Sequence, residues 1–350
     1  MASSKRNLIS SENFPTIILS AGLGERFRPH TEILPKPAIP FLNIPFLYYS
    51  IHLAEYLGTE KIVVNTHHLA EKIRSVADEA PRISTDIIFT EEQPRILGSA
   101  GGMKNAQRFL EGNGAFLSLN ADSAYLIKDF SFWNEIRKLV FDKDALAVIV
   151  LVRHEKVGTL YNGVWLDDKN LVRGFAKTSP GNTKSLRGLH YTGVILLNDE
   201  VFPMIPTHPC DIFRDVLKPA IDRGEKVFGY EVPGLWYEGG SEKGYLEDTH
   251  SALRDLQSVT KKSLIEFNNN NYVESLFHRF WSDYNQREKI LNKENTLIHS
   301  NANVSPTAIL EGFNVIGPNV KIEDHAHLKN CVITKGTVRG NETVENRLVL

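Results

Sequence analysis

Residues 16–40, TIILSAGLGERFRPHTEILPKPAIP, form the stretch of this sequence that best indicates its fold. The apolar run IIL at residues 17–19 is typical of a buried strand in a parallel sheet. It leads into a loop, residues 20–26, in which Gly22 and Gly24 permit backbone conformations that a Cβ would block. Because open α/β sheets bind ligands at the carboxyl ends of their strands, we expect this loop to line a ligand site.

The residues that follow the strand indicate an anion-binding site. Successive backbone N–H groups of such a loop can converge on one anion, and Arg26 and Arg28 add guanidinium donors suited to phosphate. Prolines on both sides of Lys36 restrict the backbone, so that its ammonium group is presented from a stiff segment. Together these features predict a polyphosphate site.

Two common phosphate-binding motifs do not fit this segment. The sequence has no G-x-x-x-x-G-K-[ST] run, and Phe27 stands where a dinucleotide-binding fingerprint needs Gly or Ala. The segment instead resembles the signature of the sugar-1-phosphate nucleotidyltransferases, roughly L-x-A-G-x-G-x-R-x-x-P-x-T-x-x-x-P-K-P. The positions in register are Leu19, Ala21, Gly22, Gly24, Arg26, Pro29, Thr31, Pro35, Lys36 and Pro37.

The composition favours a soluble enzyme. A chain of 350 residues allows one large and one smaller domain, and a hydrophobic content of 42% suffices for a sizeable core. The net charge of −2 and pI of about 6.6 argue against a nucleic-acid partner. Cys210 and Cys331 lack metal-type spacing, and no apolar run reaches membrane-spanning length. We therefore expect a cytoplasmic protein with no membrane partner.

Strand and helix patterns alternate over most of the chain, which indicates βαβ units. We expect a flexible leader at 1–13 and then a Rossmann-like, mostly parallel sheet in a three-layer αβα catalytic domain at 14–260. Between residues 161 and 194 the pattern changes to short alternating strands, which we interpret as an antiparallel insertion. Strand patterns occur at 61–66, 85–90, 115–119 and 145–152, and helical patterns at 46–57, 69–77, 212–221 and 242–256.

The C-terminal region has a period of six. Apolar residues recur at Ile298, Val304, Leu310, Ile316, Ile322 and Leu328, with Thr334 continuing the register. This period resembles the hexapeptide repeat of left-handed parallel β-helices. We expect a short β-helix at 297–350, joined by a helical linker at 261–296 whose residues 272–284 have the spacing of an amphipathic helix. Either element could mediate homo-oligomerisation.

The resemblance implies nucleotide-binding residues in two segments. The glycine loop supplies Ser20, Ala21, Gly22, Leu23 and Gly24, and the segment resembling L-G-T-A-G supplies Gly98 and Ser99. Gln93 stands where uridylyl- and thymidylyltransferases of this superfamily often have a glutamine, whereas guanylyltransferases often have a carboxylate. The sequence therefore leans to UTP or dTTP, and the adjacent Glu91 and Glu92 keep GTP close behind.

The resemblance also implies a Mg²⁺ site and a sugar site. Asp122 follows an apolar strand, and Glu238 stands where the family motif W-x-D-I-G has its metal-binding aspartate. Arg26, Lys36 and Asp122 would act in catalysis. On the sugar side, Lys177 would bind the acceptor phosphate, and the other expected contacts are Asn120, Thr192 and Gly193.

The implied reaction is in-line attack by a sugar 1-phosphate on the α-phosphorus of an NTP, with pyrophosphate leaving. Positioning and charge neutralisation would supply the catalysis. Two departures from the family pattern, Glu238 and Ala121, keep an alternative open. In that alternative the chain is a catalytically weak paralogue that binds a nucleotide sugar and regulates a partner enzyme.

Overall fold

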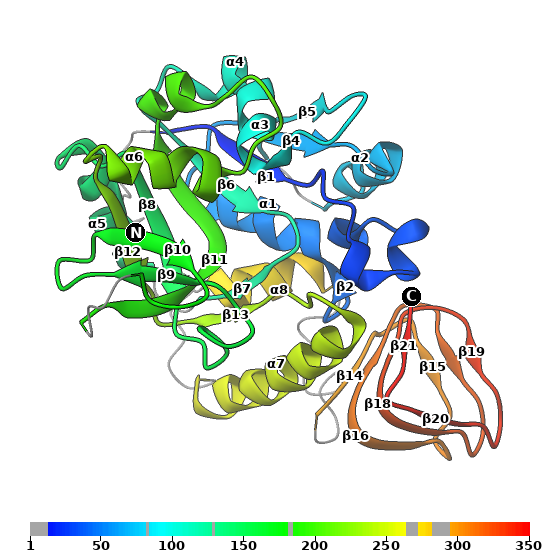
Figure 1. Cartoon of the computed structure of the whole chain (residues 1–350). Coiled ribbons are helices and arrows are strands. Elements are labelled where there is room, and N and C mark those ends of the chain that lie inside the picture. The colour runs from blue at the N-terminus through cyan, green and yellow to red at the C-terminus, as the bar shows by residue number, and fades with distance from the viewer. Residues whose placement is uncertain (1–12, 82–83, 128–129, 181–184, 264–271, 282–294) are drawn as a thin grey trace, which may run out of the picture.

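The computed structural model describes residues 13–81, 84–127, 130–180, 185–263, 272–281 and 295–350. Figure 1 shows two parts: the described residues up to 281, which we call the α/β part, and residues 295–350, which we call the strand stack. Residues 1–12 of the predicted leader lie outside the described residues, as do residues 264–271 and 282–294 of the predicted linker.

A central sheet forms the middle of the α/β part. Its main path has the order β10-β9-β11-β6-β1-β4-β5, while β8 pairs with β11 and β12. The half that contains β6, β1, β4 and β5 is parallel, and β4 is buried along its whole length, as expected for a strand covered on both faces. All four parallel strands overlap the apolar runs that predicted them: β1 (Thr16–Leu19), β4 (Ile62–Thr66), β5 (Ile87–Glu91) and β6 (Ala115–Asn120).

The other half of the sheet is built around β11, which makes the sheet mixed. This strand runs antiparallel to β6, β8 and β9, and β10 is antiparallel to β9, whereas β12 is parallel to β8. The predicted antiparallel insertion is therefore confirmed, and β11 carries it into the centre of the sheet. The strands are β8 (Ala147–Val152), β9 (Gly163–Leu166), β10 (Val172–Ala176), β11 (Arg187–Asn198) and β12 (Val227–Glu231).

Helices cover both faces of the sheet, which confirms the three-layer prediction (Figure 1). Successive side chains of β1 enter different cores: Ile18 joins the first and Ile17 the second. The first core is covered by α1 (Phe46–Tyr56), α2 (Ala70–Asp78), α5 (Phe132–Phe141), α7 (Glu242–Ser263) and α8 (Tyr272–Phe280). The second is covered by α3 (Gly98–Asn105), α4 (Gln107–Leu110), the π-helix η5 (Ile212–Leu217) and α6 (Lys218–Asp222).

Short elements lie at the ends of the parallel strands, most of them at the carboxyl ends. The two antiparallel pairs are β2 (Pro40–Phe41) with β3 (Ile44–Pro45), and β7 (Ala124–Leu126) with β13 (Leu235–Tyr237). The 3₁₀ helices are η1 (Glu25–Phe27), η2 (His30–Glu32), η3 (Lys36–Ala38) and η4 (Asp199–Met204). Of these, η4 follows β11 and lies beside the start of β6.

The β2–β3 hairpin has a two-residue turn in which both residues are left-handed. Leu42 has φ 51° and Asn43 has φ 62°, a combination that usually requires Asn or Gly. Leucine in this region costs about 1–2 kcal/mol. The conformation is held because Leu42 is fully buried and its carbonyl oxygen accepts a hydrogen bond from the Trp281 indole at 3.0 Å.

The strand stack consists only of parallel pairs, an arrangement compatible with a β-helix (Figure 1). One sheet contains β14 (Thr296–Ile298), β16 (Ile309–Ile316), β18 (His327–Ile333), β20 (Thr343–Glu345) and β21 (Leu348–Val349). A second contains β15 (Asn303–Val304), β17 (Lys321–Ile322) and β19 (Thr337–Val338). The left-handed sense in which the chain of a β-helix would coil stays a prediction.

The six-residue register is not maintained through the whole stack. Ile298 pairs with Ile316, eighteen residues later, but Ile316 pairs with Ile333 and not with Thr334. The reason is an irregularity in β16 between Glu311 and Asn314, where β16 has one residue more than its partner. The prediction that Thr334 continues the register is therefore wrong.

Helix α8 packs on α1 and closes the first core, so the predicted amphipathic helix finds its partner surface within the same chain. Tyr272, Leu276 and Phe277 are buried there. The buried His52 of α1 forms a 3.0 Å hydrogen bond with Ser275 of α8. In the part of the chain that the structure describes, no helix has both the length and the apolar character needed to span a membrane.

Acid unfolding tests the α1–α8 contact. Burial and the nearby Arg279 guanidinium lower the pKa of His52 to about 4 from 6.5. Between these pH values the unfolded chain binds a proton that the folded chain does not bind. The free energy of unfolding should therefore fall as the pH drops through this window, by up to about 1.4 kcal/mol per pH unit for one histidine. Urea unfolding of His52→Gln should show a flatter pH dependence than the unsubstituted protein.

His208→Gln, which replaces an exposed histidine outside this contact, serves as the comparison for the loss of a histidine as such. An unaltered slope in His52→Gln would show that this histidine is not the proton-linked group.

Candidate functional site

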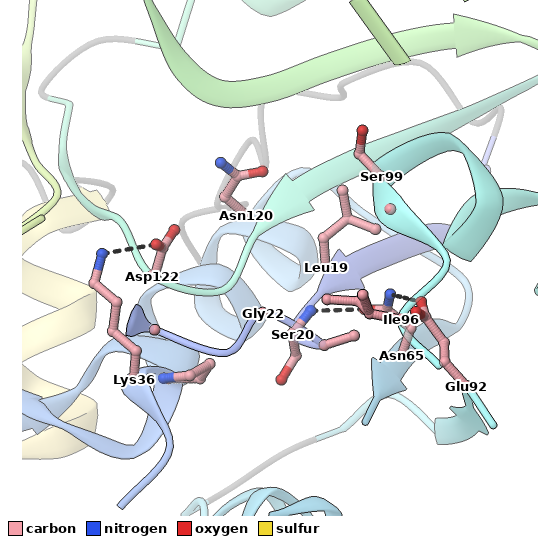
Figure 2. A pocket seen from close by; sticks show the side chains of 14 residues that line it. Leu19, Ser20, Gly22, Lys36, Asn65, Glu92, Ile96, Ser99, Asn120 and Asp122 are labelled. Carbon is pink, nitrogen blue, oxygen red and sulfur yellow. Dashed lines mark hydrogen bonds and ion pairs between the residues drawn. The ribbon is translucent and has the colours of Figure 1, made fainter. Parts of the chain in front are cut away.

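A cavity of about 260 Å³ lies at the carboxyl ends of β1, β4 and β6. Most of the expected nucleotide-binding residues line it: Ser20, Ala21, Gly22, Gly24, Gly98 and Ser99. The expected catalytic residues Lys36 and Asp122 line it as well, and so does Asn120, which was expected on the sugar side. Figure 2 shows Lys36 and Asp122 on one side of this cavity and Asn65 and Glu92 on the other. The cavity therefore lies where the first βα loop and the end of β6 meet.

The glycine loop is shaped by one steric constraint. Gly24 has φ +63°, and a Cβ there would lie 2.7 Å from the Thr31 Cγ2 atom. Thr31 also donates a 2.9 Å hydrogen bond to the Gly24 carbonyl oxygen. By contrast, a Cβ on Gly22 would meet nothing within 4 Å, so this residue leaves open space beside the cavity. The loop can thus bring its backbone close to a ligand at Gly22.

Lys36 connects the two carboxylates that were predicted to bind metal. Its ammonium nitrogen lies 2.7 Å from Asp122 Oδ2 and 3.9 Å from Glu238 Oε1. Arg26 contacts Glu238 at 3.0 Å from the other side. The lysine side chain is only 8% exposed, so the two acidic groups supply the charge partners that a buried ammonium needs. Residues from three distant segments therefore meet at one cation.

The same carboxylates fit a magnesium ion only in part. Among the described residues, no group of three or more His, Cys, Asp and Glu side chains could hold a metal. Two carboxylates are nevertheless the usual protein contribution to a Mg²⁺ site when substrate phosphates supply the remaining ligands. Asp122 and Glu238 therefore fit a metal that binds together with a phosphate substrate.

Asn65, which was not predicted, and Glu92, which was considered only as a neighbour of Gln93, form the opposite wall. Glu92 is 1% exposed, and its two oxygens accept hydrogen bonds from Asn65 Nδ2 at 2.7 Å and from the Leu97 backbone N–H at 2.6 Å. The Asn65 Oδ1 atom accepts from the Ser20 N–H at 2.6 Å. Burial raises the pKa of Glu92. This network ties the glycine loop to the segment that precedes α3.

Gln93 does not line the cavity. Its side chain is exposed and donates a 3.0 Å hydrogen bond to Glu91. The cause is the alternation of side chains along extended backbone, which turns Glu92 inward and its two neighbours outward. Of the residues considered for base recognition, the structure thus places Glu92 in the cavity wall.

The segment at Gly98 is packed against a distant loop. Gly98 has φ +76°, and a Cβ there would lie 2.5 Å from the Cys210 carbonyl oxygen. Ser99 donates to Asp211 Oδ2 at 3.1 Å and accepts from the Ile212 N–H at 2.9 Å. These contacts explain why small residues occur here and fix the start of α3 beside the cavity.

The expected sugar-side residues separate into two groups. Asn120 lines the cavity, and Gly193 packs against it, because a Cβ on Gly193 would lie 2.9 Å from Asn120 Cβ. Thr192 is 1% exposed and donates its hydroxyl to the Val150 carbonyl oxygen, which gives it a packing role. Lys177 is exposed after β10 and is not among the residues that line the cavity, and neither is Leu23.

Gly98→Ala tests the close packing of this wall. The methyl group would meet a backbone carbonyl and would also force a left-handed conformation on alanine, so we expect a loss of at least about 1 kcal/mol in unfolding free energy. Gly112→Ala is the matched control, because Gly112 also has positive φ but no atom lies within 4 Å of its added Cβ. Both substitutions place alanine at positive φ, but only Gly98→Ala brings the methyl group against another atom. Urea unfolding should therefore show a larger loss of unfolding free energy for Gly98→Ala, and equal losses would contradict the packing argument.

A family model described as "Nucleotidyl transferase" matches residues 15–255. The UTP–glucose-1-phosphate uridylyltransferase of Synechocystis sp. is 29% identical over 256 residues, which cover 69% of this chain and 64% of that protein. The probable mannose-1-phosphate guanylyltransferase 3 of Oryza sativa subsp. japonica is 24% identical over 341 residues, covering 95% of this chain and 85% of that protein. This chain therefore spans somewhat less than two thirds of the Synechocystis relative.

Solved structures share the fold. The UDP-glucose pyrophosphorylase from Acinetobacter baumanii has a TM-score of 0.56 at 20% identity, covering 73% of this chain and all of that one. HddC from Yersinia pseudotuberculosis, complexed with GMP-PN, has a TM-score of 0.54 at 21% identity and covers 67% of this chain and 97% of that one. These likenesses extend over the α/β architecture.

Proposed function

The chain belongs to the nucleotidyl transferase family, and on this premise we propose that it transfers a nucleotidyl group from an NTP to a sugar 1-phosphate. The products would be an NDP-sugar and pyrophosphate. The observation that carries the proposal is the meeting of a glycine loop, a buried lysine and Asp122 at one cavity, with Glu238 3.9 Å from the same lysine. The names of the Synechocystis and rice relatives support a sugar 1-phosphate as acceptor.

The proposed reaction needs no nucleophile from the protein. A phosphate oxygen of the sugar 1-phosphate attacks the α-phosphorus of the NTP, and the bond from that phosphorus to the bridging oxygen breaks as pyrophosphate leaves. The backbone at Gly22 and Gly24, with Arg26, would hold the β- and γ-phosphates. Lys36 would stabilise the negative charge that develops on the α-phosphate.

Asp122 and Glu238 would hold a Mg²⁺ ion together with the substrate phosphates. The ion would supply positive charge at the reacting phosphates. The backbone at Glu238 is fixed, because the N–H groups of Glu238 and Gly239 donate to Asp248 at 3.2 and 2.9 Å. The Glu238 side chain forms an ion pair with Arg26, so binding of Mg²⁺ would replace Arg26 as the partner of this carboxylate.

The catalytic reading is favoured over the regulatory alternative. Relatives across most of the α/β part are named as transferases, and the carboxylate pair is present in spite of the aspartate-to-glutamate change at Glu238. Subunit association through the strand stack remains part of the proposal, and so does the domain division at 14–260, 261–296 and 297–350.

The position of Glu92 bears on the choice of nucleotide. Gln93, on which the lean to UTP or dTTP depended, does not line the cavity and donates to Glu91, whereas Glu92 does line it. A carboxylate only accepts hydrogen bonds, and guanine offers two adjacent donor groups where uracil offers one. We therefore propose GTP as the preferred donor, with UTP or dTTP second.

Pyrophosphate release in the presence of Mg²⁺ tests the proposed function. The full chain is assayed with GTP, UTP, dTTP, CTP and ATP against a panel of sugar 1-phosphates, and GTP should give the highest kcat/KM. Omission of Mg²⁺ should abolish turnover. If no substrate pair releases pyrophosphate while calorimetry still detects binding of a nucleotide sugar, the catalytic proposal fails and the regulatory alternative is favoured.

Substitution of the charge set tests the assigned roles. Lys36→Ala and Asp122→Asn should each lower kcat by about 10²-fold or more, since each removes one preorganised charge at the reacting phosphates. Lys218→Ala, which removes an exposed ion pair with Asp222, serves as the control and should keep full activity. Circular dichroism establishes that the variants are folded. Near-normal turnover in either site variant would refute the role given to that residue.

A further inference from the structure

One outward face of the strand stack is fixed to the α/β part. Leu297, Val315, Val332 and Leu348 are aligned by successive parallel pairs, and all four belong to the buried core of the α/β part. Their neighbours Ile316 and Ile333 lie in the separate core inside the stack. We call the four aligned residues the docking column. The column makes the stack a packed element of the enzyme and not a tethered appendage.

The stack contacts the segment that carries Lys36. Asn43, at the tip of the β2–β3 hairpin, donates a hydrogen bond from Nδ2 to the Ile316 carbonyl oxygen at 3.1 Å. This hairpin begins at Pro40, directly after the short helix η3 and Ile39, and η3 starts at Lys36. Prolines at both ends of that helix limit the freedom of the connection. The position of the lysine backbone is therefore linked to the stack through a short, stiff stretch of chain.

The stack also contacts the helix that holds Glu238. Phe313 stacks on His250 of α7, with ring centroids 4.9 Å apart and planes 11° apart. The same helix carries Asp248, which accepts the two backbone N–H groups at Glu238 and Gly239. A displacement of α7 would thus move the Glu238 backbone.

The two connections meet in one group of aromatic rings. The ring centroid of Phe41, in the hairpin, lies 5.5 Å from that of Tyr237, the residue before Glu238. It lies 5.8 Å from the ring centroid of Tyr245 in α7. The Tyr245 hydroxyl donates to the Pro40 carbonyl oxygen. Hairpin and helix are therefore packed on each other, and the stack contacts both.

We propose that the strand stack is a positioning element of the catalytic centre: Asn43 and Phe313, through the hairpin and α7, set where Lys36 and Glu238 lie. This inference rests on the proposed function. Neither residue lines the cavity. Their effect would come from geometry, because a misplacement of about 1 Å at reacting groups can cost about 10²-fold in rate.

Two conservative substitutions test the proposal. Asn43→Gly removes the hydrogen bond to Ile316 but keeps the left-handed turn, and Phe313→Leu removes the ring stack but keeps an apolar side chain. Each should lower kcat by about 3- to 10-fold, which is what the loss of one such contact is worth. The KM for the NTP should change less than about twofold on the same argument, since the glycine loop is untouched, and the Mg²⁺ concentration for half-maximal rate should rise.

Matched variants separate positioning from general loss of stability. His250→Phe keeps a ring against Phe313 and should retain kcat, whereas His250→Ala should behave like Phe313→Leu. Asp324→Asn weakens an exposed hydrogen bond with Ser305 inside the stack and should leave kcat unchanged. A fall in kcat for Asp324→Asn equal to that of Asn43→Gly would overturn the proposal.

A second measurement does not depend on activity. Amide hydrogen exchange of residues 36–45 and 238–248 should be faster in Asn43→Gly and Phe313→Leu than in the unsubstituted chain and unchanged in Asp324→Asn. If the unsubstituted chain proves inactive with every substrate pair, the proposed function fails, while the exchange result still tests the coupling. An active chain in which both interface variants keep full kcat and normal exchange would refute the inference.

Discussion

The buried ammonium group of Lys36 is the constraint around which the site is organised. A charge removed from water must be paired, and the partners here are Asp122, 86 residues away in sequence, and Glu238 on a third segment. The pairing requires the ends of β6 and β13 to converge on the short helix η3. In the proposed reaction the same cation faces the α-phosphate. One ion cluster therefore explains both the convergence of the chain and the chemistry suggested for it.

Sequence reasoning was most reliable where one physical cause acted alone. The apolar runs at β1, β4 and β6 predicted parallel strands because burial on both faces leaves few residue types possible. The glycine loop could be placed because Gly24 has no room for a side chain. Asn65 follows the same rule as Asp122, a polar residue at the carboxyl end of a buried strand, and could have been found in that way.

Other features depend on tertiary contacts that no local pattern encodes. Glu92 and Gln93 are adjacent and equally polar, and only the phase of the extended chain after β5 decides which of them enters the cavity. Thr192 was expected to contact the sugar, but its hydroxyl donates to the Val150 carbonyl oxygen. The extra residue in β16 is absorbed by a local irregularity, which a six-residue count cannot detect.

The docking column has a further consequence, for the lengths that the coils can take. Parallel strands lie roughly 4.8 Å apart, so four rungs span roughly 14 Å, about the length of ten helical residues. Leu297 to Val315 spans eighteen residues and Val332 to Leu348 spans sixteen, yet the four residues stay in line. Coils that differ in length by one or two residues are therefore compatible with a continuous contact between the stack and the α/β part. Loss of a whole coil would instead remove one of the four residues of the docking column and shorten its contact with the α/β part by one strand spacing.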